Sequence, residues 1–305
     1  MTSEEIGTGR AGEKRLLLII NPVSGKKLVI RYIPQIIRTF MDAGYIVTAT
    51  VTAKHGDAAE YAARYGAVHD LICCTGGDGT LNETVSGLAR AQLDRPVGYI
   101  PCGSTNDFAA VHGLSSDIPS AAQQIIDGHL RRYDVGKFGD EFFNYVAAFG
   151  AFSWLSYTTD QNLKNMLGHA AYILDGVKDL SKIKPLHLRM TADGRRFEGD
   201  YIFGAVCNTT SIAGTIQLPA DEVDTCDGVF ELFLIRYPKT LADFEPIIRG
   251  VLLQDYTSPY IDFVHASEFF IEESEGIDWT IDGEASHAGS GMGISVLPGF
   301  LELQS

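Results

Sequence analysis

The sequence has no long apolar run. Its longest uninterrupted run, Leu16–Ile20, is far shorter than the ~20 residues that a membrane-spanning helix needs. The acidic residues Glu4, Glu5 and Glu13 near the start are not typical of a signal peptide. We therefore expect a cytoplasmic protein that touches membranes at most peripherally.

Basic residues and cysteines are both scarce. The 305 residues contain 24 Lys+Arg against 39 Asp+Glu, a formal net charge of −15. Binding to phosphate backbones requires a basic surface, so nucleic acid is excluded as a partner. The cysteines are odd in number and lack the spacing of metal ligands, which predicts free, mostly buried thiols in a reducing compartment. They are Cys73, Cys74, Cys102, Cys207 and Cys226.

Length and charge both indicate two domains. A single hydrophobic core rarely organises 305 residues. Residues 1–130 carry 11 basic and 13 acidic side chains, whereas residues 131–305 carry 13 and 26. We expect four parts in chain order: a flexible N-terminus at 1–14, an α/β domain at 15–130, a β-rich domain at 131–290, and a C-terminal segment at 291–305 that packs back on the N-terminal domain.

The two halves differ in periodicity. Strand-like runs alternate with helical stretches in the first half, which predicts a doubly wound, Rossmann-like parallel sheet with strands at Leu16–Ile20, Tyr45–Thr52, Leu71–Thr75 and Val97–Ile100. After Arg131, short alternating runs such as Phe142–Ala148 predict an antiparallel β-sandwich or open barrel. One long helical pattern, from Leu163 to Ile183, interrupts them.

A glycine-rich segment, Thr75–Glu83, lies between a predicted strand and a predicted helix. Glycines let the backbone approach a ligand closely, and the helix N-terminus offers unpaired N–H groups to phosphate. The segment lacks both the Gly-Lys-Ser/Thr of a P-loop and the spacing of a dinucleotide fingerprint. A phosphate cradle and an ordinary turn with Asp78 as a helix cap are both compatible with it.

Two more loops follow predicted strands, at Asn21–Gly25 and at Gly103–Phe108, and both combine glycine with small polar residues. Either loop alone is weak evidence. Loops at the carboxyl ends of neighbouring parallel strands meet in one crevice, however, so the three together predict a single phosphate-binding site.

These three segments resemble the catalytic domain of the diacylglycerol kinase family, in its soluble bacterial branch, with sphingosine kinases and NAD kinases as more distant relatives. The resemblance covers roughly Arg15 to Leu301. It implies ATP and Mg²⁺ as cofactors, an active site in the cleft between the domains, and Asp78 as a catalytic residue that organises the ion. The nucleotide site that it implies consists of Asn21, Pro22, Val23, Ser24, Gly25, Thr52, Gly76, Gly77, Asp78, Gly79, Thr80, Leu81, Asn82, Glu83 and Thr105.

An Asp-Gly-Glu turn follows the strand-like Trp279–Ile281. Phosphoryl transfer to an alcohol needs a group that accepts the hydroxyl proton, and the resemblance implies that Asp282 or Glu284 does so. Both side chains face the same way if the backbone stays extended through Gly283. Asp-Gly is also the common signal of a type I′ hairpin turn, which leaves a purely structural interpretation open.

An acidic loop at residues 218–229 is similar to a family segment that holds a structural Mg²⁺. We expect its ligands among Asp221, Asp224 and Asp227, although the loop is about two residues longer than is usual in the family. A solvated acidic loop without a metal is the alternative.

The family resemblance implies a lipid acceptor reached at a membrane surface. Residues 162–196 hold seven basic and three acidic side chains, so a helix there could rest on an anionic leaflet or simply close the core. We expect transfer of the ATP γ-phosphate to diacylglycerol, giving phosphatidic acid. Other acceptors (a sphingoid base, phosphatidylglycerol or another alcohol), a regulator without activity, and a homodimer remain open.

Overall fold

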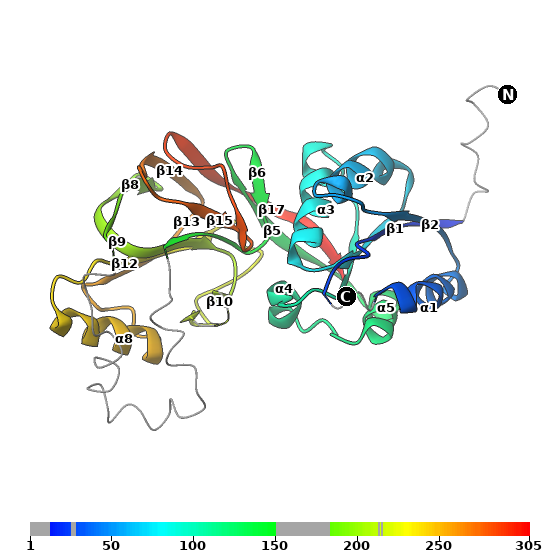
Figure 1. Cartoon of the computed structure of the whole chain (residues 1–305), viewed down its shortest axis with the longest axis horizontal. Helices are drawn as coiled ribbons and strands as arrows, with labels where there is room; N and C mark the ends of the chain where they lie inside the picture. The colour runs from blue at the N-terminus through cyan, green and yellow to red at the C-terminus, as the bar shows by residue number, and fades with distance from the viewer. Residues whose placement is uncertain (1–12, 26–28, 151–183, 213, 215) are drawn as a thin grey trace. The chain divides into compact units, whose positions relative to one another are not determined.

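The computed structural model describes residues 13–25, 29–150, 184–212, 214 and 216–305. It has two compact units (Figure 1). One contains the chain up to Arg132 together with Phe300–Ser305, and the other contains Tyr133–Gly299. Within the described ranges, no helix is both long and apolar enough to cross a membrane.

The first unit is built on a parallel sheet. The strands run in the order β17-β4-β3-β1-β2, and every pairing among them is parallel. β1 and β3 are almost wholly buried, as expected of central strands covered on both faces. The strand bounds are β1 Lys14–Ile20, β2 Tyr45–Val51, β3 Leu71–Gly76, β4 Val97–Pro101 and β17 Met292–Gln304, of which only the end of β17 belongs to this unit.

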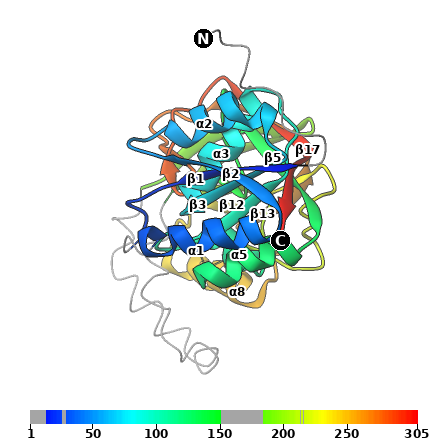
Figure 2. The ribbon, with the colours of Figure 1, turned by 90° about the vertical axis from the view of Figure 1, so that its right-hand side faces the viewer.

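Helices cover both faces of this sheet, with α1 and α5 on one side and α2 and α3 on the other (Figure 2). A core packs α1 and α5 against the buried faces of the strands. The expected doubly wound parallel sheet is therefore confirmed. The helices are α1 Val29–Asp42, α2 Asp57–Tyr65, α3 Asp78–Arg90, α4 Asp107–Val111 and α5 Ile118–Asp127, with a 3₁₀ turn at Gly66–Val68.

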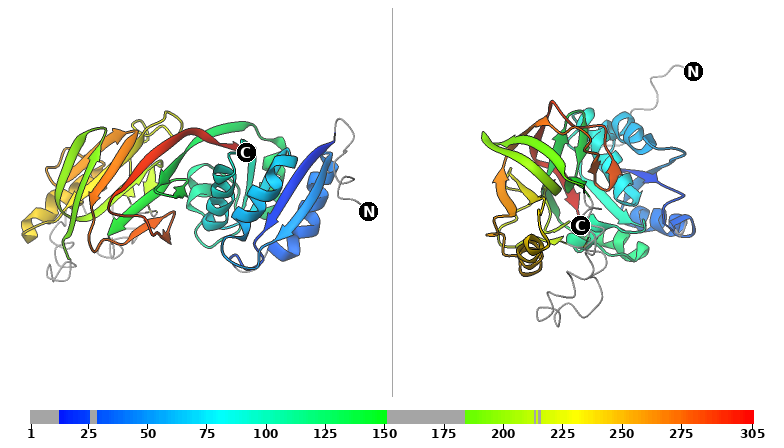
Figure 3. Two further views of the ribbon diagram at one scale, coloured as in Figure 1. Left: turned by 90° about the horizontal axis from the view of Figure 1, so that it is seen from above. Right: turned by 60° about the vertical axis from the view of Figure 1, so that its left-hand side comes forward.

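The second unit is antiparallel. The long strand β9 pairs with β7, β8 and β12, and further strands extend the sheet on either side, without closing it over the described residues (Figure 3). Its strands are β5 Leu130–Phe138, β6 Glu141–Phe143, β7 Val146–Gly150, β8 Leu186–Ala192, β9 Arg195–Cys207, β10 Ser211–Ile212, β11 Ile216–Gln217, β12 Phe230–Arg236, β13 Ile261–Ala266, β14 Glu268–Glu273, β15 Trp279–Ile281, β16 Glu284–Ala285 and most of β17.

Aromatic packing fixes β15 in this unit. The Trp279 ring lies 5.0 Å from that of Phe138 and 4.8 Å from that of Phe149, centre to centre, in edge-on contacts. Such pairs add to the stabilisation from burial alone. Because Trp279 is anchored in this way, the turn that follows β15 is held in place against β7, with which β15 pairs.

The structure corrects one expectation and adds two helices. The single strand expected at Phe142–Ala148 is interrupted between β6 and β7. Helices α5 and α8 (Phe244–Leu253) were not expected. Helix α8 packs with Gly250 close to Ile261 of β13. The expected helix at Leu163–Ile183, most of the predicted flexible N-terminus, and Lys26 and Lys27 lie outside the described residues.

Candidate active site

We number the three predicted loops in chain order, as the first (Asn21–Gly25), the second (Thr75–Glu83) and the third (Gly103–Phe108). The first and second loops are joined by a side-chain hydrogen bond. Asn21 follows β1, and its Nδ2 donates to Thr80 Oγ1 at 3.0 Å. Thr80 lies in the first turn of α3, directly after the glycine-rich turn, and is almost fully buried. The end of β1 and the start of α3 are therefore held together.

The third loop lies against the other two by close backbone approach. A Cβ atom on Gly103 would lie 2.5 Å from Gly77 Cα, and one on Gly25 would lie 2.3 Å from the Cys102 carbonyl oxygen. Side chains at these positions would not fit, so glycine is required there. The structure thus brings the three sequence-predicted loops to one edge of the sheet.

Asp78 joins the second loop to the third. Its carboxylate accepts hydrogen bonds from the backbone N–H groups of Asp107, at 3.0 Å, and Phe108, at 3.3 Å. It therefore caps α4, whereas the alternative interpretation of the sequence was a cap on its own helix. Burial raises the pKa of Asp78, the two N–H donors oppose that rise, and the charge of Asp107 adds to it.

Two residues of the third loop were missed as functional candidates. Asn106 has a φ of 54° and clasps the backbone of Gly103, accepting from its N–H at 2.9 Å and donating to its carbonyl at 3.1 Å. Asn tolerates such a left-handed conformation, which was a usable signal. Asp107 places a second carboxylate near Asp78, and burial raises its pKa.

Several other predicted nucleotide residues have internal partners. Both carboxylate oxygens of Glu83 accept backbone N–H groups at the start of α2, from Gly56 at 2.9 Å and Ala58 at 3.1 Å. Leu81 is fully buried, so its side chain belongs to the core. The backbone N–H of Thr52 donates to the Ile20 carbonyl beside the first loop.

Other predicted residues are at least partly exposed. Thr105 is exposed, and Pro22 and Ser24 are partly buried. Val23 is exposed, and its backbone N–H donates to Asn21 Oδ1 at 3.2 Å. The hydroxyl-bearing residues Ser24 and Thr105 are thus at least partly accessible to a ligand.

In the second unit, Asp282 and Gly283 form the centre of a tight hairpin turn. Their φ angles are 48° and 85°, and Ile281 pairs directly with Glu284. Positive φ at both central residues is the mark of a type I′ turn. The conditional expectation of an extended backbone through Gly283 is therefore wrong, and the two carboxylates have different environments.

The Asp282 side chain is buried and Glu284 is exposed. The Asp282 carboxylate accepts from the backbone N–H groups of Asn144, Tyr145 and Val146, at 2.7, 3.1 and 3.1 Å. It also accepts from Asn144 Nδ2 at 3.2 Å. These donors lie in the interruption between β6 and β7 and at the first residue of β7, and no signal in the sequence links them to a turn about 138 residues away.

The three predicted metal ligands do not gather into a cluster. Asp224 and Asp227 each accept a backbone N–H two residues on, from Cys226 at 3.0 Å and Val229 at 3.1 Å. Asp221 is exposed. Across the residues that the structure describes, no three His, Cys, Asp or Glu side chains lie close enough to hold a metal together.

A buried carboxylate lies beside this acidic loop and was also missed. Asp134 accepts from the N–H groups of Gly228, at 2.7 Å, and Gly299, at 2.6 Å. Burial raises its pKa, the two N–H donors oppose that rise, and the charges of Asp227 and Asp224 add to it. The loop therefore concentrates negative charge on a region partly removed from water.

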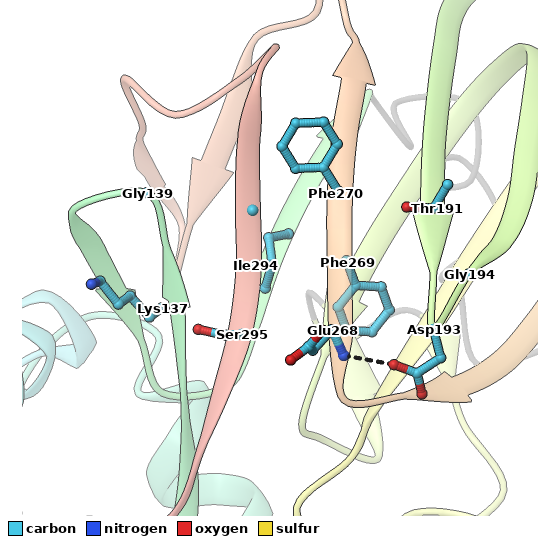
Figure 4. Close-up of a pocket in the computed structure, with 11 residues that line it drawn as sticks. Lys137, Gly139, Thr191, Asp193, Gly194, Glu268, Phe269, Phe270, Ile294 and Ser295 are labelled. Carbon is cyan, nitrogen blue, oxygen red and sulfur yellow. Dashed lines mark hydrogen bonds between the residues drawn. The ribbon is translucent and has the colours of Figure 1, made fainter.

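An open pocket of about 520 Å³ lies elsewhere on the second unit (Figure 4). Phe270, Ile294 and Lys137 line it, and Asp193 Oδ1 accepts from the Glu268 N–H at its edge. It contains none of the predicted site residues, so it does not contribute to the candidate site.

Comparison with protein families identifies both halves of the chain. Residues 15–138 match the family model described as the diacylglycerol kinase catalytic domain. Residues 153–305 match the YegS C-terminal NAD kinase beta sandwich-like domain. An α/β unit with these loops and a sandwich-like β unit define a phosphotransferase of the ATP-dependent kinase class, and the expected β-sandwich or open barrel is confirmed.

Individual relatives indicate the same family as the two family models. The chain is 34% identical to the diacylglycerol kinase of Bacillus subtilis (strain 168), covering 89% of this chain and 90% of the relative. It is 36% identical to that of Staphylococcus epidermidis (strain ATCC 12228), covering 89% and 86%. A crystal structure of a diacylglycerol kinase from Bacillus anthracis superposes with a TM-score of 0.73 at 26% identity, over 96% of both chains. The chain therefore belongs to the diacylglycerol kinase family, as its motifs predicted, and ATP is its phosphate donor.

Proposed function

We propose that this protein transfers the γ-phosphate of ATP to the free hydroxyl of diacylglycerol and forms phosphatidic acid. The observation that carries the proposal is the convergence of three loops around Asp78, at the carboxyl ends of neighbouring parallel strands. The name shared by the relatives supports diacylglycerol as the acceptor. A sphingoid base, phosphatidylglycerol or another alcohol would be served by the same chemistry and is the alternative.

We infer that the loops hold the ATP phosphates and that Asp78 holds Mg²⁺. Mg²⁺ prefers oxygen ligands, and Asp78 and Asp107 supply two carboxylates in electrostatic contact. Each carboxylate oxygen of Asp78 receives one backbone N–H, so the group is oriented while a second lone pair remains on each oxygen. The residues therefore fit the ion, which when bound would neutralise charge on the phosphates.

The Asp-Gly-Glu turn is proposed to take the proton of the acceptor. As the hydroxyl oxygen bonds to the γ-phosphorus, the bond from that phosphorus to the bridging oxygen breaks and ADP keeps its electron pair. The proton moves to a carboxylate of the turn, a step worth ~10²–10⁴-fold in rate for general base catalysis.

The test is phosphate transfer from radiolabelled ATP by the wild-type protein in Mg²⁺, with mixed micelles that contain one acceptor at a time. Diacylglycerol should be labelled far faster than a sphingoid base, phosphatidylglycerol or glycerol. Asp78→Ala should lose transfer, whereas Asp94→Ala, an exposed aspartate of the same unit, should retain it. Preferential labelling of another acceptor would replace the proposed substrate, and ATP binding without transfer would favour a regulator.

We also propose that the enzyme acts in the cytoplasm, meets its lipid at the membrane surface and forms a homodimer. The exposed edge strand β2 supports the dimer, since its sequence Tyr45–Val51 contains no charge or proline and exposes Ile46 and Val51. Light scattering of wild type and Thr48→Lys, which adds charge to that edge, tests the dimer. A monomeric wild type refutes it.

A further inference from the structure

We propose that Tyr99 is a positioning residue of the nucleotide site, and that its hydroxyl fixes the peptide between Gly76 and Gly77 so that the Gly77 N–H faces phosphate. This inference rests on the proposal that the three loops hold the ATP phosphates. It adds to them a residue of β4 that lies outside all three loops.

Tyr99 is buried where the second and third loops meet. Only 1% of the residue is exposed, and its ring contacts that of Phe108 edge-on, with 6.3 Å between the ring centres. The hydroxyl donates toward the Gly76 carbonyl and toward Asn106 Oδ1, each at 3.4 Å. One O–H group is therefore shared between the last residue of β3 and the residue that clasps the third loop.

The peptide that joins Gly76 to Gly77 has little stiffness of its own. Glycine is required at position 76, because a Cβ atom there would collide with the Thr80 side chain. Glycines on both sides of a peptide leave its plane free to rotate. Groups from other elements must therefore fix its orientation.

Two donors hold the carbonyl end of this peptide. The Cys102 N–H donates to the Gly76 carbonyl at 2.7 Å, and the Tyr99 hydroxyl approaches the same oxygen. Both donors come from β4 or from the residue directly after it. The carbonyl is thus held on the side of β3 that faces β4.

This arrangement determines where the Gly77 N–H points. The peptide is trans, so the N–H points away from the Gly76 carbonyl. Strands β4 and β1 flank β3 on opposite sides, so the N–H is turned toward the end of β1 and the first loop. Ser24 Oγ of that loop lies 3.8 Å from the Cβ position of Gly77. The N–H and the Ser24 hydroxyl would then donate to the same phosphate.

Phenylalanine at position 99 removes the hydroxyl alone. The ring contact with Phe108 is kept, and each acceptor keeps a shorter bond, from the Cys102 N–H at 2.7 Å and from the Gly103 N–H at 2.9 Å. No buried acceptor loses its last donor. Tyr99→Phe should therefore fold and melt within about 4 °C of wild type.

The experiment compares full-length wild type, Tyr99→Phe and Tyr65→Phe. The dissociation constant of Mg·ATP is measured by calorimetry, kcat and the KM for ATP with diacylglycerol micelles, and the melting temperature by thermal unfolding. Tyr65 is a partly buried tyrosine at the end of α2, outside the three loops, so Tyr65→Phe should behave as wild type.

Tyr99→Phe should raise both the dissociation constant and the KM for ATP by roughly 3–10-fold, the worth of one hydrogen bond. A rise of less than threefold in the dissociation constant overturns the assignment. Weaker binding together with a fall of more than about 4 °C in melting temperature would assign the hydroxyl to the fold, and also overturns it.

The same substitution in an Asn106→Gly background separates the two acceptors, since glycine tolerates the φ of 54° at that position. A further rise of about threefold in the ATP dissociation constant is expected, because the Gly76 carbonyl remains. No further rise would show that the hydroxyl acts through Asn106 alone, and would overturn the role of the peptide. If diacylglycerol is not the acceptor, wild type fails to label it, whereas the ATP dissociation constants still decide the role of Tyr99.

Discussion

Glu231 allows a prediction with a defined sign and size. It lies on β12 in the second unit and is 1% exposed. Neither carboxyl oxygen accepts a hydrogen bond of good geometry, and the imidazole Nε2 of His265 lies 3.9 Å from Oε1. Burial raises the pKa of Glu231 to about 8, its own backbone N–H opposes the rise, and the charges of Asp227 and Asp224 add to it.

The sign of the pH dependence follows from these values. Between the ordinary pKa of 4.5 and about 8, the folded protein holds a proton on Glu231 that the unfolded chain has released. The free energy of unfolding must therefore fall as pH rises, by about 1.4 kcal/mol per pH unit and on the order of 5 kcal/mol across the window. For a unit of this size, 1 kcal/mol corresponds to about 2–4 °C in melting temperature.

The assay is thermal unfolding of wild type, Glu231→Gln and Glu275→Gln in EDTA at pH 5, 6, 7 and 8. Glutamine keeps the shape but cannot titrate, so its melting temperature should gain roughly 3–6 °C on wild type with each pH unit. The comparison uses the slope of melting temperature against pH. The absolute melting temperatures are not compared, because a neutral glutamate and a glutamine at position 231 both lack hydrogen-bond partners of good geometry. Curves for Glu231→Gln and wild type that stay parallel would refute the reasoning, and Glu275→Gln should follow wild type.

Three further predictions concern other carboxylates. Asp78→Ala should abolish nearly all transfer and lower the melting temperature by a few degrees, because a helix cap is worth ~1 kcal/mol; wild-type kcat would contradict the Mg²⁺ role, and an unchanged melting temperature the capping role. Glu83→Gln should lower the melting temperature by roughly 2–6 °C relative to the exposed Glu60→Gln, because one of its two N–H donors would then face an amide NH₂; equal values would show that the contact is unimportant. Mg²⁺ should raise the melting temperature of wild type over that in EDTA, and the rise should vanish when Asp221, Asp224 and Asp227 are all replaced by Asn. Equal melting temperatures of wild type in the two solutions would exclude a structural ion in this loop.

The sequence predicts the parts of this protein that local chemistry determines. Buried parallel strands read as apolar runs, and Gly77 and Gly103 mark the point where two loops touch. What it does not predict depends on distant partners. The capping of α2 by Glu83 joins residues 25 to 27 positions apart, and the Asp282 contacts join residues more than 130 apart. Helix α5 was predictable from the sequence, since Asp117 caps it and a proline follows in its first turn.

The surroundings of a carboxylate, rather than its motif, decide what it can do. Asp282 is buried and accepts four N–H donors, whereas Glu231 is buried without a hydrogen bond of good geometry, so the first stabilises a turn and the second has a raised pKa. Asp78 has two donors and is only partly buried, which orients it without using every lone pair. Glu284 is exposed. Of these four, Asp78 and Glu284 are the carboxylates that an ion or a hydroxyl can reach without unfolding a strand. Phosphoryl transfer should therefore depend on these two, while substitutions at the other two should change stability first.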